Sequence, residues 1–223
     1  SSTATSAATV AVPTYLGDAL VAIFDGTTSS NITGVTDTKG NTWSRLHQYN
    51  TGSYDIEVWA VLNNPIPLAA GDVITPAFSS WASPRQLYLG VPNVNSEDFN
   101  AYVVTNGTSA TPSSGASAAL AQNGETVLGI VSNGNGGGPL VWDPGWNPFA
   151  FLQTGATEYL NVAWQVAPTT APVTASGTIT SATFTALVVA FGTGIPGQVF
   201  AATPEPNVTA AQPDPRWYYG PTP

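Results

Sequence analysis

The sequence contains neither cysteine nor methionine, a single histidine, and only 8% charged residues. The lack of cysteine excludes a disulfide framework, a thiolate nucleophile, a zinc ribbon and an iron–sulfur site. The net charge is −9, with four basic residues against thirteen acidic ones. This argues against nucleic-acid binding, which needs clustered Lys and Arg to neutralise phosphates. No apolar run approaches the roughly 20 residues that span a bilayer, so membrane insertion is not expected.

Hydrophobic residues nevertheless make up 43% of the chain, which is too many for a disordered protein. Thr and Val are abundant, the best helix formers are scarce, and short apolar runs recur between clusters of Gly, Pro, Asn and Asp. This pattern predicts an all-β fold. The predicted strands are residues 8–12, 19–24, 42–49, 55–62, 73–78 and 86–91, followed by 116–121, 126–131, 150–153, 160–166, 173–180 and 183–191.

The two series of strands resemble each other in sequence. Matching segments follow one order at a nearly constant offset: 17–23 with 124–130, 57–61 with 162–166, 71–75 with 177–180, and 87–91 with 187–191. Because either series alone would be too thin to fold, we predict a single antiparallel β-sandwich, jelly-roll-like and built from two similar sets of strands, over residues 1–194. Residues 195–223 are rich in proline, which central strands exclude, and are predicted to form an extended C-terminal arm.

Several of these segments resemble a known module. They are residues 17–22, 35–43, 58–61, 70–75 and 123–130, the Pro-Gly-Trp turn at 144–146 and the closing strand at 186–191. Together, over residues 5–194, they resemble a β-sandwich module of tailed-phage structural proteins, particularly from actinobacterial phages, and of bacterial surface proteins. The resemblance implies a virion protein, such as a minor tail or capsid decoration protein. Its motifs are scaffold positions, and it carries over no catalytic residue.

No arrangement of residues favours catalysis. His47 is the only imidazole, lies in a predicted strand and is accompanied by no Gly-x-Ser-x-Gly elbow. Asp55 and Glu57 share a strand face, as the carboxylates of a glycoside hydrolase could, but a solvent-exposed strand face has the same pattern. The loops at 25–31 and 37–41 lack the acid density of calcium sites. We expect no catalytic residues, no metal and no cofactor, and keep a glycoside hydrolase using Asp55 and Glu57 as a third alternative.

Aromatic residues are the richer signal, at 10% of the chain. Trp81 lies in a small polar loop, while Trp142 and Trp146 flank an Asp-Pro-Gly turn. These three are candidate contacts with a glycan or a host surface, because exposed Trp is enriched at binding surfaces. They support an alternative function as a carbohydrate-binding module or adhesin, located extracellularly or at a cell surface. The tryptophans expected in the core, because they fall within strand patterns, are Trp43, Trp59 and Trp164.

The C-terminal arm ends in Arg216, Trp217, Tyr218 and Tyr219. Prolines keep it extended, so it loses little entropy on docking, and its rings and guanidinium suit an anchor on a neighbouring subunit. The alternative is that the arm folds back on its own domain. We predict a non-enzymatic structural protein of a bacteriophage particle, made in the host cytoplasm and located in the virion. Its expected partners are other virion proteins and further copies of itself, with a host-surface glycan as a further candidate.

Overall fold

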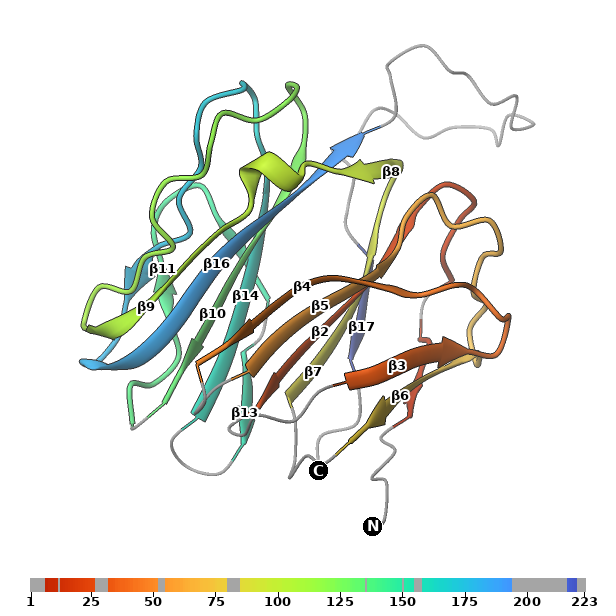
Figure 1. The fold of residues 1–223 in the computed structure, drawn as a ribbon, viewed down its shortest axis with the longest axis horizontal. Coiled ribbons are helices and arrows are strands. Elements are labelled where there is room, and N and C mark those ends of the chain that lie inside the picture. The colour runs from red at the N-terminus through yellow and green to blue at the C-terminus, as the bar shows by residue number, and fades with distance from the viewer. Residues whose placement is uncertain are drawn as a thin grey trace.

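The computed structural model describes residues 7–11, 13–26, 32–51, 55–79, 85–134, 136–149, 151–154, 158–193 and 216–219, the last four by their backbone alone. These residues form antiparallel strands in facing sheets, joined by turns and by a short 3-10 helix, η1 (Phe99–Ala101) (Figure 1). The predicted all-β sandwich is confirmed. The described part of the chain holds no helix of the length and apolarity that a bilayer span requires.

The first half of the molecule consists of a central sheet and a smaller outer sheet, built from the N-terminal strands together with the C-terminal strand β17. The central sheet has the order β17-β7-β2-β5-β4, and the outer sheet has the order β1-β6-β3. Nearly every residue of β2, β5 and β7 is buried, which explains why most of β2 reads as an apolar run, whereas β5 also buries the charged side chains of Asp55 and Glu57. The strands are β1 (Ala8–Thr9), β2 (Ala19–Gly26), β3 (Ile32–Asp37), β4 (Ser44–Asn50), β5 (Asp55–Val61), β6 (Val73–Phe78), β7 (Arg85–Val91) and β17 (Arg216–Tyr219).

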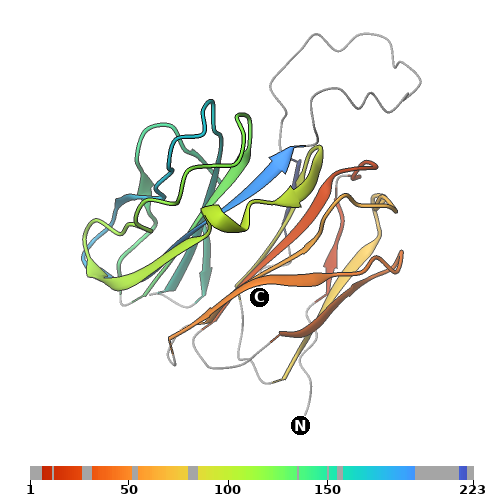
Figure 2. The same cartoon turned by 45° about the horizontal axis from the view of Figure 1, so that its top comes forward.

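The second half repeats this plan. Its central sheet has the order β12-β14-β10-β16-β8, with β13 also paired to β14 and β9 to β16, and β11 and β15 form a small outer sheet. Figures 1 and 2 show the two halves as separate layers, the first in red to yellow with the dark blue β17 added to it, and the second in green to blue. The strands are β8 (Val94–Glu97), β9 (Val103–Ser109), β10 (Thr126–Asn133), β11 (Val141–Trp142), β12 (Asn147–Pro148), β13 (Leu152–Thr154), β14 (Glu158–Val166), β15 (Gly177–Thr178) and β16 (Ala182–Thr193).

Strand register confirms that the two sets of strands are equivalent. β2 lies between β5 and β7, and β10 lies between β14 and β16, with every neighbour antiparallel. Ile23 pairs with Leu87 in the first half, and Ile130 pairs with Leu187 in the second. The sequence match between the closing strands is therefore also a match in space.

The match between Trp59 and Trp164 fails in space. Ala22 pairs with Trp59, whereas Gly129, at the equivalent place on β10, pairs with Ala163. Trp164 is thus displaced by one residue, and in a strand a displacement of one residue moves a side chain to the opposite face. Trp59 packs toward the outer sheet, and Trp164 packs against the core between the two halves.

The core lies in layers because the central sheets are covered on both faces. The cluster between the two central sheets includes Val21, Ile23, Val58, Leu89, Leu128, Ile130, Val162 and Val189. The first central sheet packs against its outer sheet through Leu20, Phe24, Trp43, Trp59, Ile74, Phe78 and Tyr88. Glu57 accepts a hydrogen bond from Ile32 of the outer sheet. Asp55 and Glu57 are both 0% exposed, so the solvent-exposed strand face considered for them is wrong.

Other predicted elements need correction. Residues 116–121 do not form a strand. Their backbone hydrogen bonds to residues 170–173 are too widely spaced: the Ser117 N–H donates to the Val173 carbonyl, and the Leu120 N–H donates to the Thr170 carbonyl. Only Gly177–Thr178 of the predicted strand 173–180 is regular. Six strands had no predicted counterpart: β3, β8, β9, β11, β12 and β17. The turn predicted at 37–41 is confirmed, with the Asp37 carboxylate accepting the backbone N–H groups of Lys39 and Asn41.

The end of the C-terminal arm lies on the molecule's own first sheet. Arg216–Tyr219 pair antiparallel with β7, from Arg216 opposite Gly90 to Tyr219 opposite Leu87. The predicted boundary between residues 194 and 195, and most of the arm, lie outside the described residues. The described end thus forms the edge strand next to β7.

Candidate functional site: a tryptophan-lined groove on the second half

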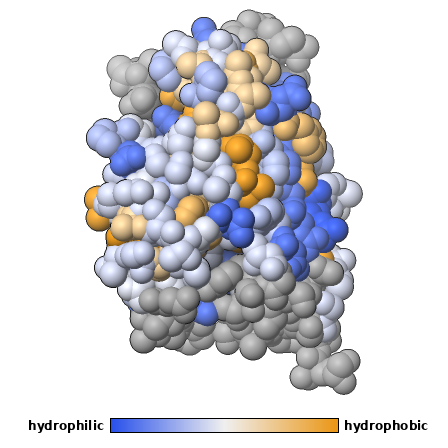
Figure 3. Space-filling model, turned by 60° about the vertical axis from the view of Figure 1, so that its left-hand side comes forward, coloured by the Kyte–Doolittle hydropathy of each residue, from blue (hydrophilic) through white to orange (hydrophobic). Residues whose placement is uncertain are grey.

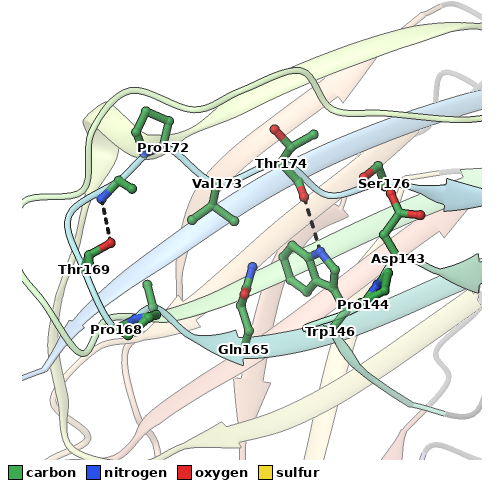
Figure 4. Close-up of a pocket in the computed structure, with 12 residues that line it drawn as sticks. Asp143, Pro144, Trp146, Gln165, Pro168, Thr169, Pro172, Val173, Thr174 and Ser176 are labelled. Carbon is green, nitrogen blue, oxygen red and sulfur yellow. Dashed lines mark hydrogen bonds between the residues drawn. The ribbon is translucent and has the colours of Figure 1, made fainter.

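A groove of about 330 Å³ opens on the outer face of β14. One wall is the turn that follows β11, the other is the segment between β14 and β15, and the floor is β14 itself (Figure 4). On the side of the molecule shown in Figure 3, most residues are pale, which marks intermediate hydropathy, and the hydrophobic residues form only small areas. The groove is lined by Asp143, Pro144, Trp146, Gln165, Ala167, Pro168, Thr169, Ala171, Pro172, Val173, Thr174 and Ser176.

Trp146 is held at both ends of its indole ring. Its Nε1–H donates to the carbonyl oxygen of Thr174 at 3.3 Å, and its ring packs beside that of Trp142, with centroids 5.4 Å apart and a tilt of 40°. Both rings lie over Gly129, where an added Cβ would come within 3.0 Å of Trp142, Trp146 and Ala175. The absence of a side chain at Gly129 therefore makes room for the two tryptophans.

The polar side chains of the groove differ in how they are engaged. The Ser176 hydroxyl donates to Oδ2 of Asp143 at 2.5 Å, and the Asp143 N–H donates to the Ser176 carbonyl at 3.1 Å. Gln165 points from β14 into the groove (Figure 4), and no hydrogen bond joins its side chain to another described residue. Among the lining residues, Asp143 alone carries a charge. The groove thus combines one fixed ring, one carboxylate and one available amide.

The predicted contact tryptophans that the structure describes, Trp142 and Trp146, lie side by side but differ in their access to the groove. Trp146 lines the groove, whereas Trp142 is not one of the lining residues and packs against the buried cluster that includes Leu140. Trp81 lies outside the described residues. The expected core positions of Trp43 and Trp59 are confirmed, since each is 8% exposed. Sequence reasoning missed Gln165, because nothing in its strand distinguishes it until the walls of the groove are in place.

The acids considered for hydrolysis are committed to structural contacts. Glu57 accepts the Ile32 N–H at 2.7 Å and the Trp59 indole N–H at 2.8 Å. Asp55 accepts the Gln48 amide at 3.0 Å. Burial, with a smaller contribution from the charge of Glu57, raises the pKa of Asp55 to about 6. Neither carboxylate reaches the surface, so their position does not support the hydrolase alternative.

A buried ion pair that was not predicted from the sequence connects the two halves of the molecule. Arg85 donates through Nε to Asp25 at 2.8 Å and through Nη1 to Glu158, on β14, at 3.0 Å. Arg85 and Asp25 are both buried. Burial raises the pKa of Asp25, although the Arg85 guanidinium opposes the change. A buried pair with a third partner in the other sheet fixes how the halves meet.

The single histidine also has a structural environment. His47 contacts the buried carboxylate of Glu97 through Nε2. Its ring stacks on Tyr102 with centroids 3.7 Å apart, and Phe99 meets its edge. These contacts join β4 of the first half to β8 and to the segment that follows it. Among the described residues, no serine or threonine hydroxyl is a partner of the His47 side chain.

The described residues contain no group of three or more His, Asp or Glu side chains arranged to hold a metal ion. Of the two loops considered for calcium, residues 27–31 lie outside the described part. In the other, both carboxylate oxygens of Asp37 accept hydrogen bonds, including one from the Trp43 indole at 2.8 Å.

Comparisons with protein-family models, with curated proteins and with solved structures found no match to this chain. The groove, the terminal strand and the buried acids are therefore interpreted from their own geometry.

Proposed function

We propose that this chain is a non-enzymatic structural protein of a bacteriophage particle, a minor tail or capsid decoration protein, that assembles through its C-terminal strand. The observation that carries the proposal is the pairing of Arg216–Tyr219 with the edge of β7. The phage setting rests on the resemblance of the scaffold motifs to tailed-phage β-sandwich modules. The virion is accordingly the proposed location.

The β7 edge needs a covering strand. Without β17, β7 would be the last strand of its sheet and would present a row of unpaired backbone N–H and C=O groups. In the second half, the equivalent strand β16 is covered by β8 and β9, which directly follow β7 in the chain. β17 in turn follows β16. Thus β8 and β9, which follow β7 of the first half, complete the second half, and β17, which follows β16 of the second half, completes the first half.

A neighbouring copy offers the same edge. Pairing between strands uses backbone groups, so β7 of a second copy is chemically equivalent to β7 of the first. The connection between Thr193 and Arg216 is long enough to span up to about 70 Å when extended, which allows the terminal strand to reach another subunit. We propose that in the particle β17 of one copy completes the first sheet of its neighbour.

Composition and burial support a structural role over catalysis. Only 8% of residues are charged, and neutral polar surfaces bring little charge repulsion when many copies pack together. The imidazole and the acids that catalysis would need are engaged in the core or at the junction of the halves, as described for His47, Asp55 and Glu57.

Engineered disulfides test whether β17 pairs with β7 of a neighbouring copy. The chain has no native cysteine that could form other disulfides. Leu87 and Tyr219 are direct partners in the β7–β17 register, within reach of a disulfide. A mixture of the single variants Leu87→Cys and Tyr219→Cys should give a cross-linked dimer under oxidation. The control mixture, Leu87→Cys with Arg216→Cys, joins positions that are not partners and should give much less.

The double variant Leu87→Cys/Tyr219→Cys distinguishes pairing of β17 with β7 of the same copy from pairing with β7 of a neighbouring copy. Exchange predicts cross-linked multimers whose yield rises with protein concentration. If the double variant yields only an internal disulfide, and the mixture yields no dimer at any concentration, assembly through this strand is wrong.

A further inference from the structure

The groove around Trp146 has the features of a ligand site that is independent of the β7 edge. It lies on the second half of the molecule, whereas the terminal strand completes the sheet of the first half. We propose that this groove binds a neutral carbohydrate, with the Trp146 ring as the stacking surface and with Gln165 and Asp143 as partners for hydroxyl groups. This goes beyond the assembly role and does not depend on it.

The aromatic surface is preorganised. The hydrogen bond to the Thr174 carbonyl and the packing over Gly129 fix Trp146 from two directions. A ring that is already immobile loses little entropy when a ligand stacks on it. The apolar C–H face of a pyranose gains from burial against such a ring. Three prolines, Pro144, Pro168 and Pro172, stiffen the walls.

The polar groups match hydroxyls rather than an apolar ligand. The Gln165 side chain offers two donors and one carbonyl acceptor, and no hydrogen bond joins it to another described residue. The Asp143 carboxylate has two oxygens with acceptor capacity beyond the one bond from Ser176. A vicinal diol, which both donates and accepts, can use an amide and a carboxylate together. A purely apolar ligand would leave the Gln165 amide without a partner.

Charge and size narrow the ligand class. Asp143 is the sole charged residue among those that line the groove, and the whole chain carries −9. Phosphorylated, sulfated and acidic sugars would therefore meet repulsion rather than a cationic partner. The volume of about 330 Å³ lies at the lower end of small-ligand sites, about 300–1,000 Å³. This size suits one or two sugar rings of a neutral oligosaccharide rather than a folded partner.

The test uses the purified full chain against an array of neutral and acidic oligosaccharides, with a proline-rich peptide series included. Neutral ligands that bind are then titrated by calorimetry. Gln165→Ala should weaken binding by at least about fivefold through loss of hydroxyl hydrogen bonds. Trp146→Ala should abolish binding. Gln153→Ala, which removes the same side chain from β13 outside the groove, should leave affinity unchanged.

Each outcome decides the proposal. Because Trp146 packs in a core cluster, its variant is accepted only if circular dichroism shows a native fold, and Gln165→Ala provides the test otherwise. The proposal is wrong if no neutral saccharide binds, if only acidic sugars or peptides bind, or if Gln165→Ala binds as tightly as the original chain. A chain that lacks residues 203–223 should still bind the saccharide. That result separates this proposal from failure of the assembly role.

Discussion

Asp55 offers a quantitative test of the layered core. Burial raises the pKa of its carboxyl group to about 6, from 3.8. Between these values the folded chain holds a proton that the unfolded chain has released. The contribution of Asp55 to the free energy of unfolding, and hence to stability, should therefore fall as the pH rises from about 4 to about 7. A difference of about two pKa units corresponds to about 3 kcal/mol.

The substitution Asp55→Asn isolates this contribution, since asparagine cannot ionise and its carbonyl can still accept the Gln48 amide. Urea unfolding of both proteins, followed by tryptophan fluorescence at pH 4, 5, 6 and 7, gives the difference in stability at each pH. We expect the original chain to lose up to about 3 kcal/mol relative to the variant across this range. A difference that does not change with pH, or that changes with the opposite sign, would refute the burial of an ionisable Asp55.

Asp72 provides a control of opposite sign. Hydrogen bonds from the Thr38 hydroxyl and the Ala69 N–H, with the nearby charge of Lys39, lower its pKa. Its stabilising effect is therefore present above the pKa of the unfolded chain and is lost as the pH falls. The same titration of Asp72→Asn should show the original chain gaining relative stability as the pH rises.

Two further substitutions probe packing and the buried ion pair. Gly129→Val should destabilise the fold by about 1–3 kcal/mol, because its Cβ meets two tryptophans and an alanine at 3.0 Å; Gly34→Val, where no atom lies within 4 Å, should change stability much less. Arg85→Met should cost about 3–5 kcal/mol at pH 7, since it leaves the buried Asp25 without its guanidinium partner; a loss below 1 kcal/mol in urea unfolding would contradict the pairing.

The sequence predicted the central strands because burial on both faces leaves a strong apolar signal. β2 and β10 are buried at every position, and their neighbours repeat the same order of strands. β9 was missed because it is an edge strand whose middle, Thr105–Thr108, is polar and exposed. An edge strand is identified by the partner to which it bonds, and the partner of β9, β16, is remote in the chain.

The errors share a physical cause. The alternating sequence pattern correctly predicted that Asp55, Glu57 and Trp59 share one face of a strand. The pattern carries no information on which other part of the molecule covers that face. The same limit applies to the groove. Aromatic content drew attention to Trp146, whereas Gln165 became a candidate only when the fold placed it in the same groove.

The central claim, assembly through the C-terminal strand, is tested most directly by the mass of the protein in solution. Sedimentation equilibrium should be measured for the full chain and for a chain that lacks residues 203–223, over a range of concentrations. Our account predicts a multiple of 22.9 kDa for the full chain at high concentration and a folded monomer after the deletion. A full chain that stays monomeric throughout, or a truncated chain that still assembles, would contradict it.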